Sequence, residues 1–451
     1  MGDPFVIIGG DAAGMSAASK AKREDPDLDI VVFERGEWVS YAACGMPYYV
    51  KGDVETLDDL VQVTPAEFRT ERDIDLQTEH EVVGIDPDSQ TVTVTTNGER
   101  FEQPYDTLLI ATGAHAVEPP FEGRDLDGVF TIHSMDDAAA IRHYIDEQEP
   151  QSAAIVGGGY VGIEMAEALD EHDIDVSIFE MLSHVLQPFG ASAATVIEDH
   201  LREQRIDLHL ETSVDGFTGT EVVDGIVVEE ETIPTEMVIV GVGVAPNVEL
   251  AQQAGIEIGE TGAIATDEFG RTNYEDVFAA GDCAQSAHVV TGEPAHVPLA
   301  LTANRGGRAI GQTVTGTPTA VGRIAGTAIV KAFESGAART GVLDEQRARD
   351  AGFEPVSVEI SAPTRAHYYP GAEDLTVSLV ADQRTNRVIG ASLAGPDGLK
   401  RIDTVATALH GEMTVAAVET LDLAYAPPYS PVWDPVATAA RVLSGQVEHT
   451  E

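Results

Sequence analysis

The 451-residue chain has very little cysteine: Cys44 and Cys283 are its only thiols. Two cysteines cannot build a disulfide framework in a chain of this length, and no metal-ligand spacing surrounds them, so we expect a reducing compartment and no bound metal. Apolar runs of about 18 residues are also missing, so no membrane-spanning helix is predicted. The amino terminus lacks the basic segment of a signal peptide. We therefore expect a cytoplasmic protein without a membrane partner.

Positive charge is scarce as well. The chain carries 77 acidic and 26 basic residues, for a net charge of −51. A surface this acidic disfavours binding to the phosphate backbone of nucleic acids, which requires basic patches. An ordinary solvated surface is one explanation of the acidity, but the scarcity of lysine favours a halophilic protein whose self-repulsion is screened by a salty cytoplasm. The lysines are Lys20, Lys22, Lys51, Lys331 and Lys400.

Glycine is plentiful and marks two similar segments of the chain. In the first segment, an apolar run at residues 5–8 enters a glycine turn at residues 9–14, and a helix of small residues follows. A second apolar run at residues 30–33 ends at Glu34. This order predicts a βαβ unit of the dinucleotide-binding kind. The turn is irregular, because Asp11 occupies the usual place of the middle glycine.

The second segment repeats this order with a regular turn. An apolar run at residues 153–156 precedes the turn, and the strand predicted at residues 176–179 ends at Glu180. The glycines of the turn are Gly157, Gly159 and Gly162. Glycines at this spacing allow a tight turn and let the backbone approach a pyrophosphate at the helix N-terminus. We therefore expect a cofactor site here, with a plain packing turn as the alternative.

Glu180 bears on the choice of cofactor. A carboxylate at this position accepts a hydrogen bond from a ribose 2′-hydroxyl and repels a 2′-phosphate, which favours NADH over NADPH. Arg142 or His184 would offset this preference if either lay nearby. Because the chain contains two such units, it is expected to bind two dinucleotides.

Further apolar and alternating runs extend this plan. Apolar runs that each enter a glycine turn occur at residues 107–110, 237–240 and 277–280. Alternating runs at residues 91–94 and 225–228 predict small antiparallel sheets. After about residue 320, more alternating runs precede a helical stretch near residues 402–409, which predicts an α+β domain.

Cys44 lies in a segment, residues 40–48, that is rich in glycine, proline and tyrosine. Free cysteines are most often buried small apolar residues, and that is the alternative here. Its position soon after the first nucleotide unit favours a working thiol, whose pKa would be lowered by helix N-terminal amides or by contact with an oxidised flavin. Cys283, beside Asp282, is expected to be a packed residue.

The chain resembles the pyridine nucleotide-disulfide oxidoreductases along nearly its whole length. Within them it is most similar to the single-cysteine branch of coenzyme A-disulfide reductases, NADH oxidases and persulfide reductases. The motifs that carry the resemblance are the two glycine turns, the segment around Cys44, and residues 111–113, 243–247, 280–282 and 298–300. The irregular first turn is also typical of the family. Tyr49 stands where dual-cysteine relatives have their second cysteine, so an internal disulfide is excluded.

The resemblance implies an α/β fold with two Rossmann-like dinucleotide-binding domains, one for FAD and one for NADH or NADPH, plus a C-terminal α+β dimerisation domain. It therefore also implies a homodimer. The expected ranges are 1–115 and 246–320 for the two parts of the FAD domain, 116–245 for the NAD(P)H domain and 321–451 for the dimerisation domain.

Roles for individual residues follow from the same resemblance. FAD would be held by Gly9, Gly14, Glu34, Arg35, Ala111, Thr112, Gly113, Asp282 and Ala300. NAD(P)H would be held by Gly157, Gly159, Tyr160, Gly162, Glu164, Glu180 and Gly243. Tyr160 would cover the nicotinamide side of the flavin until the nucleotide displaces it. A small-molecule disulfide such as CoA disulfide would be bound by Ser16, Lys20, Arg23, Ser40, Arg72 and Asn304.

Three catalytic residues are implied: Cys44, Tyr368 and Tyr425. In coenzyme A-disulfide reductases the two tyrosines reach the cysteine of the other subunit, and ordinary interface packing is the alternative. Ala12 disfavours an NADH oxidase, because those enzymes usually carry histidine there. We therefore expect coenzyme A-disulfide reduction through a Cys44 mixed disulfide. The alternatives are an NADH oxidase working through a Cys44 sulfenic acid and an NAD(P)H-dependent persulfide or polysulfide reductase.

Two departures from the family pattern leave the disulfide substrate open. Reductases of this kind usually have asparagine where this chain has Ala43, and some members have lysine at the position of Trp433. The disulfide of another small thiol is therefore an alternative to CoA disulfide. A redox-sensing flavoprotein with slow turnover is the alternative from a different functional class.

Overall fold

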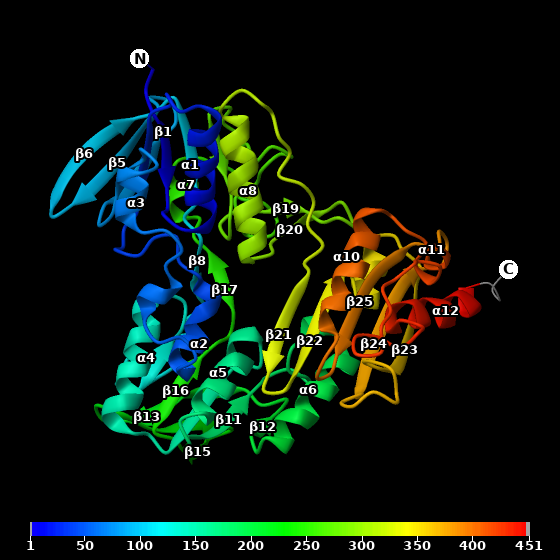
Figure 1. Cartoon of the computed structure of the whole chain (residues 1–451). Helices are drawn as coiled ribbons and strands as arrows, with labels where there is room; N and C mark the ends of the chain where they lie inside the picture. Colours follow the sequence, from blue (N-terminus) through cyan, green and yellow to red (C-terminus); the bar gives the residue numbers. More distant parts are fainter. Residues whose placement is uncertain (1, 448–451) are drawn as a thin grey trace.

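The computed structural model describes residues 2–447, which form three five-stranded sheets with helices packed around them (Figure 1). The first sheet is parallel and gathers strands from distant parts of the chain. Its strands, in order, are β18 (Val277–Ala279), β7 (Thr107–Ile110), β1 (Phe5–Ile8), β2 (Ile30–Phe33) and β3 (Asp75–Gln77). Helices α1 (Ala12–Glu24) and α8 (Ala300–Thr313) pack side by side against it.

The second sheet is also parallel and contains the second nucleotide unit. Its strands, in order, are β12 (Asp207–His209), β11 (Asp175–Phe179), β10 (Ser152–Val156), β16 (Met237–Val240) and β9 (Val129–Thr131). Its helices are α4 (Met135–Gln148), α5 (Tyr160–Asp170) and α6 (Ala191–Glu203). The chain passes between the first and second sheets along an antiparallel pair, β8 (Ala114–Ala116) and β17 (Val244–Pro246).

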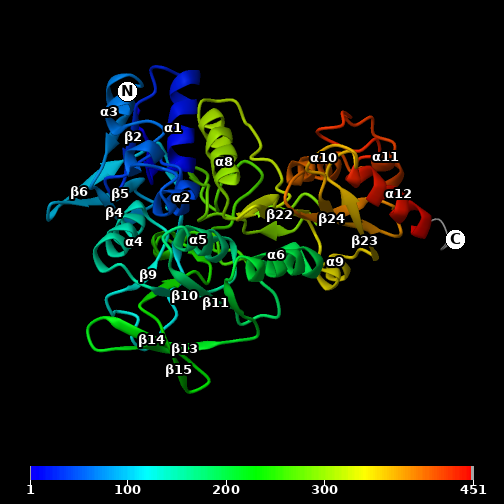
Figure 2. The ribbon, with the colours of Figure 1, turned by 60° about the horizontal axis from the view of Figure 1, so that its bottom comes forward.

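The third sheet is antiparallel and belongs to the C-terminal domain. Its strands, in order, are β21 (Ala328–Ala332), β22 (Ser335–Gly341), β25 (Val388–Ala394), β24 (Asp374–Asp382) and β23 (Pro355–Pro363). Its helices are α9 (Glu345–Asp350), α10 (Ile402–His410), α11 (Val415–Glu419) and α12 (Pro435–Val447). Helix α6 reaches from the second sheet to this domain and packs against it (Figure 2).

Short elements complete the fold. The two small antiparallel sheets are β4 (Glu81–Asp86), β5 (Thr91–Thr96) and β6 (Glu99–Pro104), then β13 (Val214–Gly219), β14 (Val223–Val228) and β15 (Glu231–Pro234). A two-stranded ribbon is formed by β19 (Ser286–Ala287) and β20 (Pro294–Ala295). The short helices are α2 (Met46–Lys51), α3 (Pro65–Thr70) and α7 (Glu249–Gln253). No helix among residues 2–447 is long and apolar enough to cross a membrane.

Burial explains why the apolar runs in the sequence become strands of the two parallel sheets. All four residues of β1 and of β16 are buried, because helices and loops cover both faces of each sheet. Strands in that setting appear as continuous apolar runs, whereas the C-terminal strands β23 and β24 alternate because they are less completely covered. The strand and helix predictions at these positions are confirmed, as is the α/β fold class.

Two glycines bring α1 and α8 into backbone contact. A Cβ atom at Gly307 would overlap the carbonyl oxygen of Ala13, and one at Gly311 would overlap that of Ala17. Helices this close place polar residues from both on one surface. That surface forms part of the functional site.

Candidate active site

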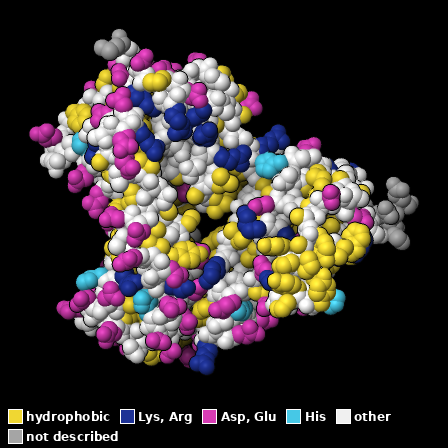
Figure 3. All heavy atoms as spheres, viewed as in Figure 1, with side chains coloured by type: hydrophobic (Ala, Val, Ile, Leu, Met, Phe, Trp, Pro, Cys, Tyr) yellow, Lys and Arg dark blue, Asp and Glu magenta, His cyan; other side chains and the backbone are white. Residues whose placement is uncertain are grey.

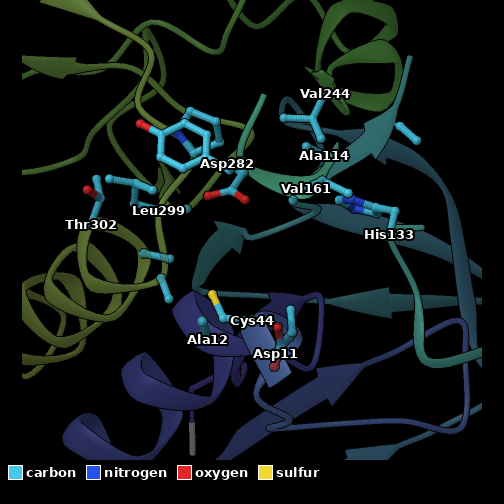
Figure 4. Close-up of a pocket in the computed structure, with 18 of the residues that line it drawn as sticks. Asp11, Ala12, Cys44, Ala114, His133, Val161, Val244, Asp282, Leu299 and Thr302 are labelled. Carbon is cyan, nitrogen blue, oxygen red and sulfur yellow. The ribbon is translucent and has the colours of Figure 1, made fainter. Parts of the chain in front are cut away.

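One cavity of about 2460 Å³ reaches all three sheets of the fold. Its walls include both glycine turns, the Cys44 segment, the start of α8 and the edge of β21 and β22. In Figure 4, Cys44 and Asp282 project into the same space from opposite walls. The two predicted cofactor sites and the predicted thiol therefore open into one volume.

The first glycine turn connects β1 to α1 with a backbone that excludes side chains. Gly9 has a φ of +110°, and a Cβ atom at Gly14 would overlap the carbonyl oxygen of Gly9. At the end of β2, the Glu34 carboxylate accepts the backbone N–H groups of Gly10 and Gly36, both at 2.8 Å. Glu34 therefore ties the turn to the neighbouring strand, a structural contact that the sequence did not reveal.

The second glycine turn repeats this construction. Gly157 has a φ of +106°, and a Cβ atom at Gly162 would overlap the carbonyl oxygen of Gly157. Glu180 accepts backbone N–H groups from the turn and from Leu182, at 2.7 and 2.8 Å. A Cβ atom at Gly159 would meet nothing within 4 Å, so the space over the turn is open.

Both turns fit the pyrophosphate of a dinucleotide. Helices α1 and α5, which follow the turns, have no side-chain cap and no acidic residue in the first turn. By contrast, α3 and α4 have complete capping boxes. The first N–H groups of α1 and α5 are therefore available to an anionic ligand, and each helix N-terminus favours negative charge.

Arg142 and His184 do not offset the preference for NADH, because neither is free to bind a 2′-phosphate. Arg142 is outside the cavity, and its Nη1 donates to the carbonyl oxygens of Tyr49 and Val50 at 3.2 Å. His184 lines the cavity, but its Nδ1 lies 3.0 Å from the buried carboxylate of Glu198. Both residues are thus engaged elsewhere.

Cys44 is an exposed thiol presented by a short 3₁₀ turn, η1 (Ala43–Gly45), directly before α2. Its sulfur points into the cavity (Figure 4). Cys283, in contrast, is 0% exposed, and its Sγ lies 3.5 Å from the carbonyl oxygen of Ile110. The prediction that Cys283 is a packed residue is confirmed.

The protein groups around Cys44 raise the pKa of its thiol, so the expected activation by helix N-terminal amides is not found. Burial by the cavity walls raises the pKa of this thiol, and the carboxylates of Glu164 and Asp282 raise it further. Helix α2 has only six residues, and its short dipole does not outweigh these effects. Stabilisation of a Cys44 thiolate therefore has to come from what binds in the cavity.

Asp11, the residue that makes the first turn irregular, connects this turn to the Cys44 segment. Its Oδ1 accepts the backbone N–H of Tyr41 at 3.0 Å. Burial, with the nearby carboxylates of Glu34 and Asp282, raises the pKa of Asp11 to about 6. Its place in the motif is explained by this contact, because glycine has no side chain that would make it.

Tyr160 and Glu164 lie on successive turns of α5 and line the cavity. The Tyr160 ring packs edge-on against Phe189 with centroids 5.3 Å apart, and its hydroxyl accepts from Arg339 Nε at 3.3 Å. Glu164 accepts from the Tyr48 hydroxyl at 3.2 Å, and burial raises the pKa of Glu164 to about 7. Glu164 is therefore a group that titrates near neutral pH beside the cavity.

A basic wall of the cavity lies over α1 and α8 (Figure 3). We define the basic wall as Arg23, Arg72, Arg305 and Arg308, all of which line the cavity. No carboxylate in the described part of the chain forms an ion pair with any of them, although acidic residues outnumber basic ones. Ser16 donates to Asn304 at 2.6 Å across the contact between the two helices. The arrangement favours an anionic group at the mouth of the cavity.

Lys20 does not belong to this wall. Its amine is turned inward, pairs with Glu24 one turn later on α1, and does not line the cavity. The side chain is 9% exposed, because helix packing covers it. A role for Lys20 in binding substrate is therefore not supported by its position.

Tyr368 and Tyr425 lie outside the cavity that contains Cys44 of the same chain. Their hydroxyl groups are 3.4 Å apart, their side chains are 65% and 47% exposed, and neither lines the cavity. They belong to an exposed apolar surface of the C-terminal domain, seen in yellow beside α12 in Figure 3. Its other large members are Tyr369, Tyr429, Val432 and Trp433.

Most predicted site residues nevertheless converge on the cavity. Its lining includes Gly9, Ser16, Arg23, Glu34, Arg35, Ser40, Cys44, Arg72, Ala111, Thr112, Gly113, Gly157, Gly159, Tyr160, Glu164, Glu180, Gly243, Asp282, Ala300 and Asn304. Gly14 and Gly162 lie behind the turns and act through close packing.

Sequence reasoning missed several residues of the site. Arg305 and Arg308 had a usable signal, because Arg308 follows Asn304 by one helical turn on α8. Tyr48 and Arg339 had none, since each contacts a residue more than 100 positions away in the sequence.

Comparisons with known proteins agree with this site. The pyridine nucleotide-disulphide oxidoreductase family matches residues 3–304, and the dimerisation domain of the same family matches residues 327–436. The NAD(P)H coenzyme A polysulfide/persulfide reductase of Pyrococcus horikoshii is 41% identical over 439 residues, covering 97% of this chain and 98% of the relative. The coenzyme A disulfide reductase of Staphylococcus haemolyticus is 31% identical, covering 94% and 96%.

A solved structure is similar over nearly the whole chain. The NAD-dependent persulfide reductase from A. fulgidus has a TM-score of 0.96 and 40% sequence identity, covering 99% of this chain and 84% of the other. Fold, site and family matches thus agree over both nucleotide units and the C-terminal domain. This chain belongs to the pyridine nucleotide-disulphide oxidoreductase family, whose cofactors are FAD and NAD(P)H.

Proposed function

We propose that this protein is an FAD-dependent NAD(P)H:disulfide reductase that acts on CoA disulfide through Cys44. The observation that carries the proposal is the position of Cys44, an exposed thiol in a cavity that also contains both dinucleotide turns. The other thiol of the chain is fully buried and has no access to a substrate.

The basic wall supports an anionic disulfide. Phosphate groups are recognised by arginine through charge-assisted and often bidentate hydrogen bonds. The four arginines gather on one wall of the cavity in a chain with a net charge of −51, and none forms an ion pair there among the described residues. The phosphates of CoA fit this wall, and the names of two relatives include coenzyme A.

The sulfur chemistry is an exchange followed by a two-electron reduction. The Cys44 thiolate attacks one sulfur of the disulfide, one CoA thiolate leaves and takes up a proton, and a Cys44–CoA mixed disulfide remains. FAD, held by the first glycine turn and Asp282, would supply the relay by which two electrons from NAD(P)H reach this sulfur. The S–S bond then breaks, the second CoA leaves as a thiolate that takes up a proton, and Cys44 returns to the thiolate.

Two further groups have roles in this proposal. Tyr160, at the start of α5 and on the cavity wall, covers the nicotinamide side of the cofactor site. Tyr368 and Tyr425 protonate the CoA thiolate that leaves at the active site of a second subunit. They act on that subunit because they lie outside the cavity of their own chain. Glu180 and the positions of Arg142 and His184 favour NADH.

Reduction of a CoA-linked persulfide or polysulfide is the second candidate. It uses the same thiol and the same basic wall, because the attacked sulfur is again attached to CoA. The 41% identity of the Pyrococcus horikoshii relative, against 31% for the Staphylococcus haemolyticus relative, favours it.

An NADH oxidase is less well supported. Ala12 lies beside Cys44 in the cavity (Figure 4) and brings no imidazole to a sulfenic acid at that position.

A substrate panel tests the proposal. The FAD-loaded protein is assayed for NADH consumption with CoA disulfide, CoA persulfide, other thiol disulfides, polysulfide and O₂ in molar KCl. We expect CoA-linked sulfur to give the highest kcat/KM. Consumption driven equally well by O₂ alone would favour the oxidase, and no turnover with any of these would favour a sensor.

The variant Cys44→Ser tests the role of the thiol. Disulfide-dependent NADH consumption should fall to background, while FAD absorbance per chain stays at the wild-type level, since the serine hydroxyl cannot form a mixed disulfide. Mass spectrometry of the intact wild-type protein should detect the CoA adduct on Cys44. Disulfide-dependent turnover by the serine variant would contradict the proposal.

A further inference from the structure

Helix α2, which follows Cys44, is held by side chains of the second nucleotide unit. The carbonyl oxygens of Tyr49 and Val50, near the end of α2, accept from Arg142 Nη1 at 3.2 Å. His172 Nε2 lies 2.7 Å from the same Val50 oxygen. Helix-terminal carbonyls have no partner within the helix, and cationic donors there are favourable. Arg142 and His172 belong to the second nucleotide unit, so this unit caps the Cys44 helix.

Two side-chain contacts join α2 to α5 along their length. Tyr48 donates to Glu164 at 3.2 Å, and Lys51 donates to Glu167 at 3.0 Å. Tyr48 and Lys51 are three residues apart on α2, as Glu164 and Glu167 are on α5, so each pair shares one helix face. The contacts therefore repeat at matching intervals and fix both the distance and the rotation of α2.

Glu167 extends this connection to the C-terminal domain. Its carboxylate also accepts from the Lys331 amine of β21 and from the backbone N–H of Phe333 at 2.8 Å. The residue is 6% exposed, and although burial opposes ionisation, these hydrogen bonds keep the pKa of Glu167 below its usual value. One buried carboxylate thus connects α2, α5 and strand β21 of the C-terminal sheet.

The composition of the chain makes this convergence informative. Two of its five lysines, Lys51 and Lys331, donate to the same carboxylate, whereas lysine is otherwise scarce. Apolar packing follows the same junction, because Met46 and Val50 of α2 belong to one core cluster with α5 and with Phe333. Charge and packing therefore both hold the Cys44 helix at this junction.

We propose that Lys51 and Glu167 are positioning residues that hold α2, and with it Cys44, at a fixed place relative to α5. This inference rests on the proposed role of Cys44. Thiol–disulfide exchange and electron transfer to sulfur require the sulfur to be held in a narrow range of positions. A loosened α2 lets Cys44 move away from the cavity walls around it, while the nicotinamide side at Tyr160 keeps its own support.

The test compares Lys51→Met and Lys51→Arg with Lys22→Met in the FAD-loaded protein. Lys22 is a matched control, because its partner Asp73 is exposed and neither residue lines the cavity. For Lys51→Met we expect kcat with CoA disulfide to fall by about tenfold. Flavin reduction by NADH should change less than twofold. Lys51→Arg should retain most activity, and Lys22→Met should match the wild type.

Alkylation of Cys44 by iodoacetamide across pH provides the second measurement. Because burial contributes most to the raised pKa of Cys44, a loosened α2 should lower the pH at which the thiol becomes reactive in Lys51→Met. A role in stability alone would lower the melting temperature and leave this profile unchanged. Glu167→Gln and Lys331→Met should shift the profile in the same direction if they fold with FAD bound.

Wild-type kcat together with a wild-type alkylation profile in folded Lys51→Met would overturn the inference. Failure of the proposed function is a distinguishable result. Alkylation and flavin reduction need no disulfide substrate, so the positioning role can be judged even if CoA disulfide proves inert with the wild-type protein.

Discussion

At the residue scale, the reactivity of Cys44 depends on charges that come from other parts of the chain. Burial contributes most to disfavouring its thiolate, and the carboxylates of Glu164 on α5 and Asp282 after β18 add to this effect. The protein groups around Cys44 therefore favour the thiol over the thiolate. For a thiol that has to survive in the absence of substrate, this arrangement limits unwanted oxidation.

Replacing Glu164 with glutamine should make Cys44 more acidic. Above pH 7 the wild-type carboxylate is mostly charged, since its pKa is about 7, and it opposes thiolate formation. Removing that charge should lower the pKa of Cys44. Below pH 6 the wild-type Glu164 is mostly neutral, so the two proteins should react alike.

The measurement is the rate constant of Cys44 alkylation between pH 5 and pH 10, taken on the FAD-loaded protein. Glu171→Gln is the control, because Glu171 lies at the end of the same helix and is exposed. Overlapping wild-type and Glu164→Gln profiles above pH 7 would show that the charge of Glu164 does not raise the pKa of Cys44.

At the element scale, the two nucleotide units are built alike but serve different cofactors. In each unit a glycine of the following helix packs against the carbonyl oxygen of the first glycine of the turn. Each unit also ends in a glutamate whose carboxylate accepts two backbone N–H groups. The same substitution should therefore affect the binding of a different cofactor in each unit.

Gly14→Ala should abolish FAD binding, whereas Gly162→Ala should leave FAD bound and raise the KM for NADH at least about tenfold. In both variants the new Cβ overlaps a backbone carbonyl, so the turn has to open and its N–H groups move off the phosphate. The ratio of flavin to protein absorbance measures the first effect, and steady-state kinetics measure the second. Loss of FAD from both variants would mean that the second unit supports the first structurally.

Much of the fold could be predicted from these elements. The strands of both parallel sheets appear as apolar runs because they are buried on both faces, and the turns between strand and helix require glycine. Cys44 could be identified as a candidate because the chain has only one other cysteine, Cys283. The junction of Lys51 with Glu167 could not be predicted, because the two residues are 116 positions apart and meet only after the sheets pack.

The expected effect of helix N-terminal amides on the pKa of Cys44 was wrong for a related reason, whereas the expected effect of an oxidised flavin stays a prediction. The sequence shows the local helix start but not the carboxylates that other elements bring to the same space. The position of Lys20 shows the same limit, since the family resemblance placed it with Ser16 and Arg23 as a substrate-binding residue, yet its amine pairs with Glu24.

At the scale of the whole molecule, the charge of −51 should make stability depend on salt. Most acidic side chains are exposed and repel one another, and a salt concentration of about 0.1 M already reduces the range of this repulsion to roughly 10 Å. The melting temperature of the FAD-loaded protein should therefore rise by several degrees between dilute buffer and molar KCl. A melting temperature that does not change over this range would show that repulsion among the acidic side chains does not destabilise the protein.

The exposed tyrosines bear on the assembly of the active site. Tyr368 and Tyr425 face away from the cavity of their own chain, on an apolar surface of a domain that matches a dimerisation domain. If they act on the Cys44 of a second subunit, each site needs residues from two chains. A cysteine variant and a tyrosine variant should then complement each other.

Mixing Cys44→Ser with the double variant Tyr368→Phe/Tyr425→Phe, followed by dissociation and reassociation, tests this arrangement. Each homodimer lacks one required group at both sites, whereas a mixed dimer has one complete site made of Cys44 from one chain and the tyrosines from the other. Random pairing makes half of the dimers mixed, so activity should recover to about a quarter of the wild-type value. If the tyrosines act within their own chain, mixing restores nothing beyond the sum of the two parents, because no rearrangement of subunits then creates a complete site.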